Sequence, residues 1–204
     1  MKNKNLLIVF VKNPVVGKVK TRLAKEIGEN KAHKVYKELL SITEKATLAG
    51  KNYDLHIYFS DFIEKTLWSE KKKYIQNGND LGERMLHAFQ DGFKLGYAKI
   101  ILIGSDLPDI SAEIIQNGFD ALDKNDFVFG PAIDGGYYLI GMKVLHHELF
   151  KNKPWSTSNL LGITLKQLEE NRKSVFCLAK LNDIDEHEDL DHPKFTSYKN
   201  HCNV

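Results

Sequence analysis

The chain has 204 residues, a length that suits one domain with an ordinary hydrophobic core, and we expect a single domain over residues 1–204. Its 29 basic and 27 acidic residues nearly balance and are interspersed, which argues against a nucleic-acid partner, since such proteins concentrate basic charge on one face. No segment approaches the roughly 20 apolar residues of a membrane helix. The N-terminus lacks the pattern of a signal peptide. We therefore expect a cytoplasmic protein with no membrane association.

Apolar strands alternate with amphipathic helices along the chain. This alternation predicts an α/β fold with three layers, a single domain whose mostly parallel sheet is covered by helices on both faces. The nearly unbroken apolar runs at 6–11 and 99–104 predict central, parallel strands buried on both faces. Further strands are expected at 55–60, 74–76, 127–130, 137–142 and 174–180, with helices at 30–49, 81–95, 111–122 and 159–171 and a short one after Asp61.

The segment KNPVVGKVKTRL, residues 12–23, follows the first strand and leads into a helical pattern. Phosphates bind at such strand–loop–helix junctions, where helix amides and cationic side chains converge. Lys20 provides a mobile point charge and Arg22 a planar fork for phosphate oxygens, while Lys12 and Gly17 belong to the loop itself. The spacing matches neither a Walker loop nor a GxGxxG fingerprint. A solvated basic first turn of a helix is the alternative.

The segment GSDLPDI, residues 104–110, places carboxylates directly after the second buried strand. Mg²⁺ prefers oxygen ligands and commonly uses one or two carboxylates together with substrate phosphates. Asp106 is our candidate metal ligand, and Asp109 is a weaker one. Either aspartate could instead form an Asx turn or cap the helix that begins near Ser111.

The segment GPAIDGGYYLIG, residues 130–141, carries a turn between two strands. Asp134, Gly135 and Gly136 are compatible with a plain hairpin, or with a close approach of the backbone to a ligand. Tyr137 and the tyrosine after it point to opposite faces, so we expect at most one of them to line a site.

Two weaker features follow the same logic. Arg84 starts a helix from which it could reach a phosphate, although Asp80 more simply caps that helix. Trp155 lies in a polar loop and could support a sugar or a base, whereas Ser158 could serve only as a cap. Of the two cysteines, which lack any metal or redox spacing, Cys177 is expected to be buried.

The unusual loops 12–19, 105–110 and 132–136 all follow strands. Ligands bind beyond the carboxyl ends of the strands in open α/β sheets. The sequence therefore predicts that the three loops open on one edge of the sheet and form one site there.

Six motifs in order resemble those of the DUF2064 family of GT-A-like transferases, often called cofC-like glycosyltransferases. They span residues 10–190 and read FVKNPVVGKVKTRLA, GNDLGERM, LIGSDLPDI, FGPAIDGGYYLIG, PWSTSNLLGITL and LNDIDEHEDL. The resemblance implies a nucleotide-diphospho-sugar transferase fold, related to guanylyltransferases. It also implies that Lys20 and Arg22 handle phosphates and that Asp106 handles a divalent metal. His187 stands where the family commonly has proline, which weakens a catalytic role for Asp185.

The leading functional hypothesis is a metal-dependent transferase, glycosyltransferase-like, that uses a nucleotide-sugar donor and a small-molecule acceptor. The donor phosphates would lie against the 12–22 loop, with Mg²⁺ or Mn²⁺ on Asp106. A nucleotidylyltransferase that releases pyrophosphate suits the same loop equally well. A non-catalytic nucleotide-binding module is the third hypothesis. The base, the sugar, the acceptor and the oligomeric state stay open.

Overall fold

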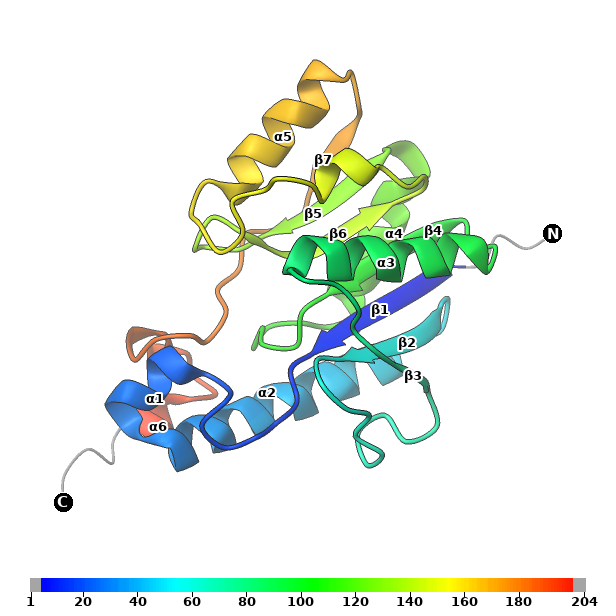
Figure 1. The fold of residues 1–204 in the computed structure, drawn as a ribbon. Coiled ribbons are helices and arrows are strands. Elements are labelled where there is room, and N and C mark those ends of the chain that lie inside the picture. Colours follow the sequence, from blue (N-terminus) through cyan, green and yellow to red (C-terminus); the bar gives the residue numbers. More distant parts are fainter. Residues whose placement is uncertain (1–4, 200–204) are drawn as a thin grey trace.

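The computed structural model describes residues 5–199, which form one seven-stranded sheet with helices on both faces (Figure 1). In chain order the elements are β1 (Asn5–Val11), α1 (Thr21–Ile27), α2 (Glu29–Ala49), β2 (Asp54–Phe59), β3 (Lys72–Ile75), α3 (Leu81–Lys94), β4 (Lys99–Ile103), α4 (Ala112–Lys124), β5 (Phe127–Pro131), β6 (Tyr137–Met142), η1 (His147–Leu149), α5 (Leu160–Glu170), β7 (Val175–Cys177), η2 (Glu188–Asp191) and α6 (Thr196–Lys199).

The strand order is β3-β2-β1-β4-β6-β5-β7. β1 is central and pairs in parallel with β2 and β4, as the apolar run predicted. β4 is also central and buried, but its second neighbour, β6, is antiparallel. β6 follows β5 through a short connection, and a short connection can join only antiparallel strands. The mostly parallel α/β sheet is confirmed, with one antiparallel strand inserted beside β4.

Two apolar layers cover the sheet. The side chains of α2 and α4 pack on one face, around Tyr36 and Phe119. The side chains of α3 and α5 pack on the other face, around Phe89 and Leu168. A third, smaller cluster joins α1 and α2 to the C-terminal segment through Leu190 and Phe195, which holds that segment beside α1 (Figure 1).

Several expected details differ in the structure. No helix follows Asp61, because the side chain of Asn13 accepts hydrogen bonds from the amides of Asp61 (2.9 Å) and Phe62 (3.2 Å) and so fixes a loop there. The helix expected at 81–95 forms as α3, but its first residue, the apolar Leu81, is exposed.

The last strand is also shorter than expected. β7 pairs only with β5 in the described part of the chain, and it spans three residues of the expected 174–180. Cys177 is exposed, not buried, because it lies on a short strand at the edge of the sheet. The other cysteine, Cys202, lies outside the described residues.

Within residues 5–199, every helix is too short or too polar to span a lipid bilayer.

Candidate functional site

The three loops predicted to converge do meet at one edge of the sheet. The carboxyl ends of β1, β4 and β5 point the same way, and the start of β6 joins them there. Two adjoining pockets open at this edge, and they share Arg22, Asp106 and Asp185 among other residues. We call them the cationic pocket and the aromatic pocket.

The cationic pocket has a volume of about 490 Å³ and lies between the 12–22 loop and the start of α3. Four basic side chains line it, together with uncharged polar side chains that include two serines and a glutamine. These residues are Lys12, Lys20, Arg22, Arg84, Ser60, Gln76 and Ser105.

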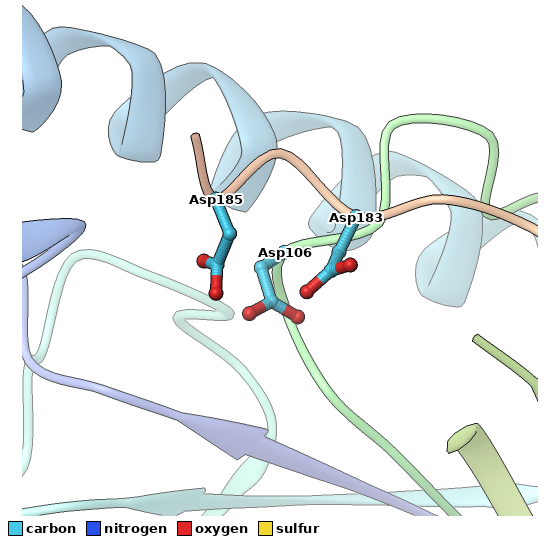
Figure 2. Close-up of side chains that lie close together, drawn as sticks. All are labelled: Asp106, Asp183 and Asp185. Atoms are coloured by element: carbon cyan, nitrogen blue, oxygen red, sulfur yellow. The ribbon is translucent and has the colours of Figure 1, made fainter. Parts of the chain in front are cut away.

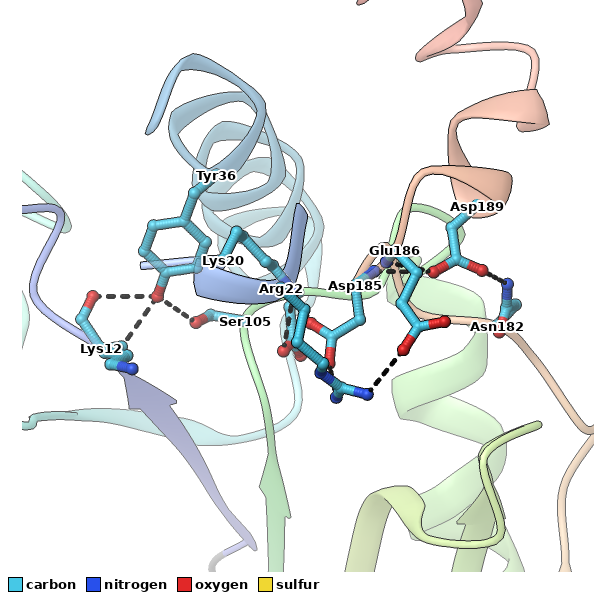
Figure 3. Close-up of polar contacts among 10 residues, drawn as sticks. Lys12, Lys20, Arg22, Tyr36, Ser105, Asn182, Asp185, Glu186 and Asp189 are labelled. Atoms are coloured by element: carbon cyan, nitrogen blue, oxygen red, sulfur yellow. Dashed lines mark hydrogen bonds and ion pairs between the residues drawn. The ribbon is translucent and has the colours of Figure 1, made fainter. Parts of the chain in front are cut away.

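A buried tyrosine fixes the first loop to α2. The Tyr36 hydroxyl donates to the carbonyl of Lys12 (2.9 Å) and accepts from the Lys12 amide (3.1 Å), as Figure 3 shows. It also lies 3.0 Å from the Ser105 hydroxyl, which connects the loops after β1 and β4. Burial raises the pKa of Tyr36 to about 12, so the hydroxyl keeps its proton and remains a donor.

Lys20 is held in a strained and buried position. It precedes α1 rather than lying within it, and its backbone is left-handed (φ 47°), which costs a non-glycine residue ~1–3 kcal/mol. Its side chain is only 4% exposed, and Nζ contacts Asp106 Oδ2 at 3.2 Å and Asp185 Oδ1 at 2.8 Å. Burial alone disfavours the ammonium, but the two carboxylates outweigh it and raise the pKa of Lys20. The amine is therefore charged at any physiological pH.

Arg22 lies on the first turn of α1, more exposed than Lys20. Its Nη2 contacts Asp185 Oδ2, and its Nη1 lies 3.1 Å from Glu186 Oε1. The charge of Asp185, followed by the contributions of Glu186, raises the pKa of Arg22. Asp185 contacts both cations, so one carboxylate orients both (Figure 3).

Three aspartates gather where the two pockets meet. Asp106, Asp183 and Asp185 each offer one oxygen, and these oxygens lie within 4.8 Å of one another. Figure 2 shows Asp106 coming from the loop after β4 and the other two from the C-terminal segment. Burial raises the pKa of Asp183 to about 7, and the charges of Asp106 and Asp185 add to the effect. Carboxylates so crowded provide the hard oxygen donors that divalent cations prefer.

The C-terminal segment presents its aspartates through a local cap. Asp189 accepts hydrogen bonds from the amides of Asp185 (2.9 Å) and Glu186 (2.7 Å) and from the side chain of Asn182 (2.7 Å). Ile184 lies between the two site aspartates in sequence and is 1% exposed in the third apolar cluster. Burying Ile184 directs its neighbours outward, into the site.

Sequence reasoning did not select Asp183 or Asp185. Both lie in an acidic run, 183–191, that follows the last expected strand, and the family's usual proline is absent at His187. One signal was present: the order Asp-Ile-Asp places an apolar anchor between two carboxylates, the pattern of an extended segment with one buried side.

The aromatic pocket has a volume of about 430 Å³ and lies on the other side of the cluster. Tyr137 and Trp155 line it, and Tyr138 does so as well, although the two tyrosines pack in different apolar layers. At most one tyrosine was expected there. Both reach the pocket because β6 begins at its edge.

Glycines let the walls of this pocket close together. A Cβ on Gly82 of α3 would lie 2.5 Å from Trp155 Cζ2, so the indole packs directly on the helix backbone. A Cβ on Gly135 (φ 91°) would lie 1.9 Å from the Ser158 carbonyl oxygen, and the Gly135 carbonyl accepts from the Leu161 amide at 3.0 Å. The loop after β5 and the start of α5 thus form one continuous wall.

The remaining predicted residues occupy varied positions. Asp134 and Gly136 line the aromatic pocket, and Asp134 Oδ1 accepts from the Gly136 amide (2.8 Å) in an Asx turn. Arg84 lines the cationic pocket while its Nε donates to the Gly78 carbonyl (3.1 Å). Gly17 (φ 77°) packs beside the carboxylate of Glu29.

Asp109 does not join the carboxylate cluster. Its Oδ1 pairs with His192 Nε2 at 3.0 Å and lies 3.8 Å from Lys194 Nζ, which ties the loop after β4 to the C-terminal segment. Asp80 and Ser111 are helix caps, accepting from the amides of Glu83 and Ile114.

Comparisons with known proteins place the fold. A family model described as "Uncharacterized protein conserved in bacteria (DUF2064)" matches residues 45–157, more than half of the chain. A search of curated proteins finds no match.

Solved structures resemble this chain over nearly its whole length. A crystal structure from Desulfovibrio desulfuricans G20, provisionally described as a nucleotide-diphospho-sugar transferase, is 33% identical, with a TM-score of 0.88 over 97% of this chain and 89% of that chain. A nucleotidyl transferase from Methanothermobacter is 14% identical (TM-score 0.66, 96% of this chain and 98% of that one). The inositol-1-phosphate CTP transferase from T. maritima is 12% identical (TM-score 0.62, 99% of both chains). The last two likenesses concern the fold alone.

Proposed function

This chain belongs to the DUF2064 family, and from that premise we propose that it is a transferase that uses a nucleotide-activated donor, with glycosyl transfer as its leading reaction. One observation carries the proposal. Two cations, Lys20 and Arg22, are held by carboxylates at the junction of two pockets, at the sheet edge where α/β folds bind ligands.

The donor would occupy the cationic pocket. Its phosphates would lie toward Lys20, Arg22 and Arg84, which are positioned before any ligand arrives. The Lys20 ammonium and the Arg22 guanidinium are held by Asp185, so they need little reorganisation to stabilise charge that develops on the departing phosphate. The 33% identical relative, described as a nucleotide-diphospho-sugar transferase, supports glycosyl transfer.

The carboxylate cluster fits a divalent cation such as Mg²⁺ or Mn²⁺. Three carboxylates against one buried ammonium leave excess negative charge, and the raised pKa of Asp183 reflects it. Asp106, Asp183 and Asp185 would hold the ion, which would supply a Lewis acid beside the donor phosphates. Of these three aspartates, the sequence proposed only Asp106 for this role.

Nucleotidyl transfer is the second candidate. The likeness in fold extends to nucleotidyl transferases. Phosphoryl transfer depends chiefly on positioning and charge stabilisation, which these cations provide equally well. The two reactions differ in their product, because glycosyl transfer releases a nucleotide and nucleotidyl transfer releases pyrophosphate.

Calorimetric titration with nucleoside triphosphates and nucleotide sugars, with and without Mg²⁺ or Mn²⁺, tests the proposal. We expect a nucleotide to bind, and Arg22→Ala to weaken binding by ~1.5–3 kcal/mol, the range for hydrogen bonds to charged groups. The exposed Lys18, replaced by alanine, is the control. Unchanged affinity in a folded Arg22→Ala protein would contradict the phosphate site.

A matched pair of variants tests the dependence of nucleotide binding on the metal. Asp106→Asn should abolish the effect of the divalent ion on nucleotide affinity, whereas Asp109→Asn, on the same loop but paired with His192, should preserve it. Equal metal effects in the two variants would show that Asp106 is not a ligand. Assays for released nucleotide and for pyrophosphate on the bound donor then separate the two reactions.

A further inference from the structure

The two pockets differ in charge although they share a boundary. The cationic pocket is lined by Lys12, Lys20, Arg22 and Arg84 against two carboxylates. The aromatic pocket has the opposite balance, because Arg22 is its one cation among the residues that line it, whereas four carboxylates do so. These are Asp106, Asp134, Asp183 and Asp185.

The single cation of the aromatic pocket is already engaged. Arg22 also lines the cationic pocket, where the donor phosphates would engage its guanidinium beside Asp185 and Glu186, so it has little charge left for a second anion in the aromatic pocket. A divalent ion bound to the three clustered aspartates would offset only part of the carboxylate charge, so the lining of the aromatic pocket would still carry no net positive charge. A phosphate group on a ligand in this pocket would therefore face repulsion with no partner.

The rest of the wall suits an uncharged ring. The indole of Trp155 packs on α3 at Gly82, and Tyr137 packs edge-on against Phe129, with ring centroids 5.3 Å apart. Beside the indole lie the hydroxyl-bearing residues Thr157 and Ser158. Aromatic surface with a few polar groups is the usual lining of a pocket for a small molecule that has one apolar face.

We propose that the aromatic pocket is the acceptor site and that it selects a non-phosphorylated hydroxyl compound with a ring face, such as a sugar or glycoside, over its phosphate ester. This inference rests on the proposed function, since an acceptor requires a donor. The acceptor hydroxyl would approach along the shared boundary at Asp106 and Asp185, where the donor phosphates are held on the other side.

Binding of a matched pair of probes tests the selection. Phenyl β-D-glucoside and its 6-phosphate are titrated against the protein, and the emission of Trp155 is followed. The chain has two tryptophans, and Trp155→Phe identifies the signal that belongs to this one. We expect the glucoside to change the emission of Trp155 and to bind at least tenfold more tightly than the 6-phosphate.

A substitution at Asp134 tests the role of charge in the aromatic pocket. Asp134 lines the aromatic pocket and not the cationic one, and asparagine can still accept the bond from the Gly136 amide. Asp134→Asn should reduce the preference for the neutral probe at least threefold. A 6-phosphate that binds as tightly as the glucoside, or an unchanged preference in Asp134→Asn, would overturn the inference, and so would a Trp155 signal that responds to neither probe.

Nucleotide binding is measured on the same samples without probe. If no nucleotide binds, the proposed function is refuted. If a nucleotide binds but the protein does not prefer the glucoside over its 6-phosphate, only the assignment of the acceptor site is refuted. The two failures are therefore distinguishable.

Discussion

Replacing the buried His56 by phenylalanine should remove the loss of folding stability at acid pH that this histidine causes. His56 lies on β2, is 1% exposed, and neither ring nitrogen has a hydrogen-bond partner among the described residues. Its ring packs between Tyr74 and Tyr97, with centroids 5.2 and 5.7 Å away. Burial, with a contribution from Lys72, lowers the pKa of His56 to about 4.

The magnitude follows from linkage. The unfolded chain protonates His56 near its ordinary pKa of 6.5, whereas the folded chain does so only near 4. Above pH 6.5 the ionisation of His56 does not lower the free energy of unfolding. As the pH falls from 6.5 to 4 that free energy decreases, because the unfolded state binds the proton first. The difference corresponds to ~3 kcal/mol over the full window. At neutral pH, His56→Phe should be neutral or stabilising by ~1–2 kcal/mol, because two unpaired polar atoms are removed.

Urea unfolding at pH 7.5 and 4.5 measures this effect. The free energy of unfolding of His56→Phe, relative to wild type, should be ~2–3 kcal/mol higher at pH 4.5 than it is at pH 7.5. The exposed His147, replaced by phenylalanine, should show no such change. If the relative stability of His56→Phe is the same at both pH values, the buried imidazole is not protonated differently in the two states and the reasoning is refuted.

Three further predictions concern the site and the sheet edge. With divalent metal removed by a chelator, Asp183→Asn should stabilise the fold by ~2 kcal/mol or more at pH 8 but by little at pH 3.8. The reason is that a carboxyl whose folded pKa is about 7 costs stability as the pH rises from 3.8 to 7. Urea unfolding at both pH values checks the sign of the difference. Gly82→Ala should destabilise by ~1–3 kcal/mol in thermal unfolding and shift the Trp155 emission, since its Cβ would meet that indole and the Phe150 carbonyl; unchanged emission would contradict the packing. The exposed Cys177 thiol should react with Ellman's reagent in the folded protein, and Cys177→Ser should lower the thiol count by one.

Local sequence patterns were sufficient for much of the framework. The apolar runs predicted β1 and β4, and the amphipathic pattern predicted α2 to within a residue. Burial on one or two faces leaves a periodicity that depends only on neighbouring positions. The convergence of three loops at one edge also followed from the sequence, since the direction of parallel strands fixes where their carboxyl ends lie. The insertion of β6 beside β4 did not, because strand order depends on contacts between distant segments.

Some residues of the site could be predicted from the sequence, and others only from the tertiary structure. The residue types at Lys20, Arg22 and Asp106 were chosen from their place after buried strands. The tertiary structure alone brought Asp185 to within 2.8 Å of Lys20, a contact between positions 165 residues apart. Burial of Ile184 in a cluster with α1 and α2 is what delivers Asp183 and Asp185, and no local pattern encodes which surface such an anchor will find. The sequence by itself thus determined which strands would present chemistry, and only the packing of the C-terminal segment decided which carboxylates complete it.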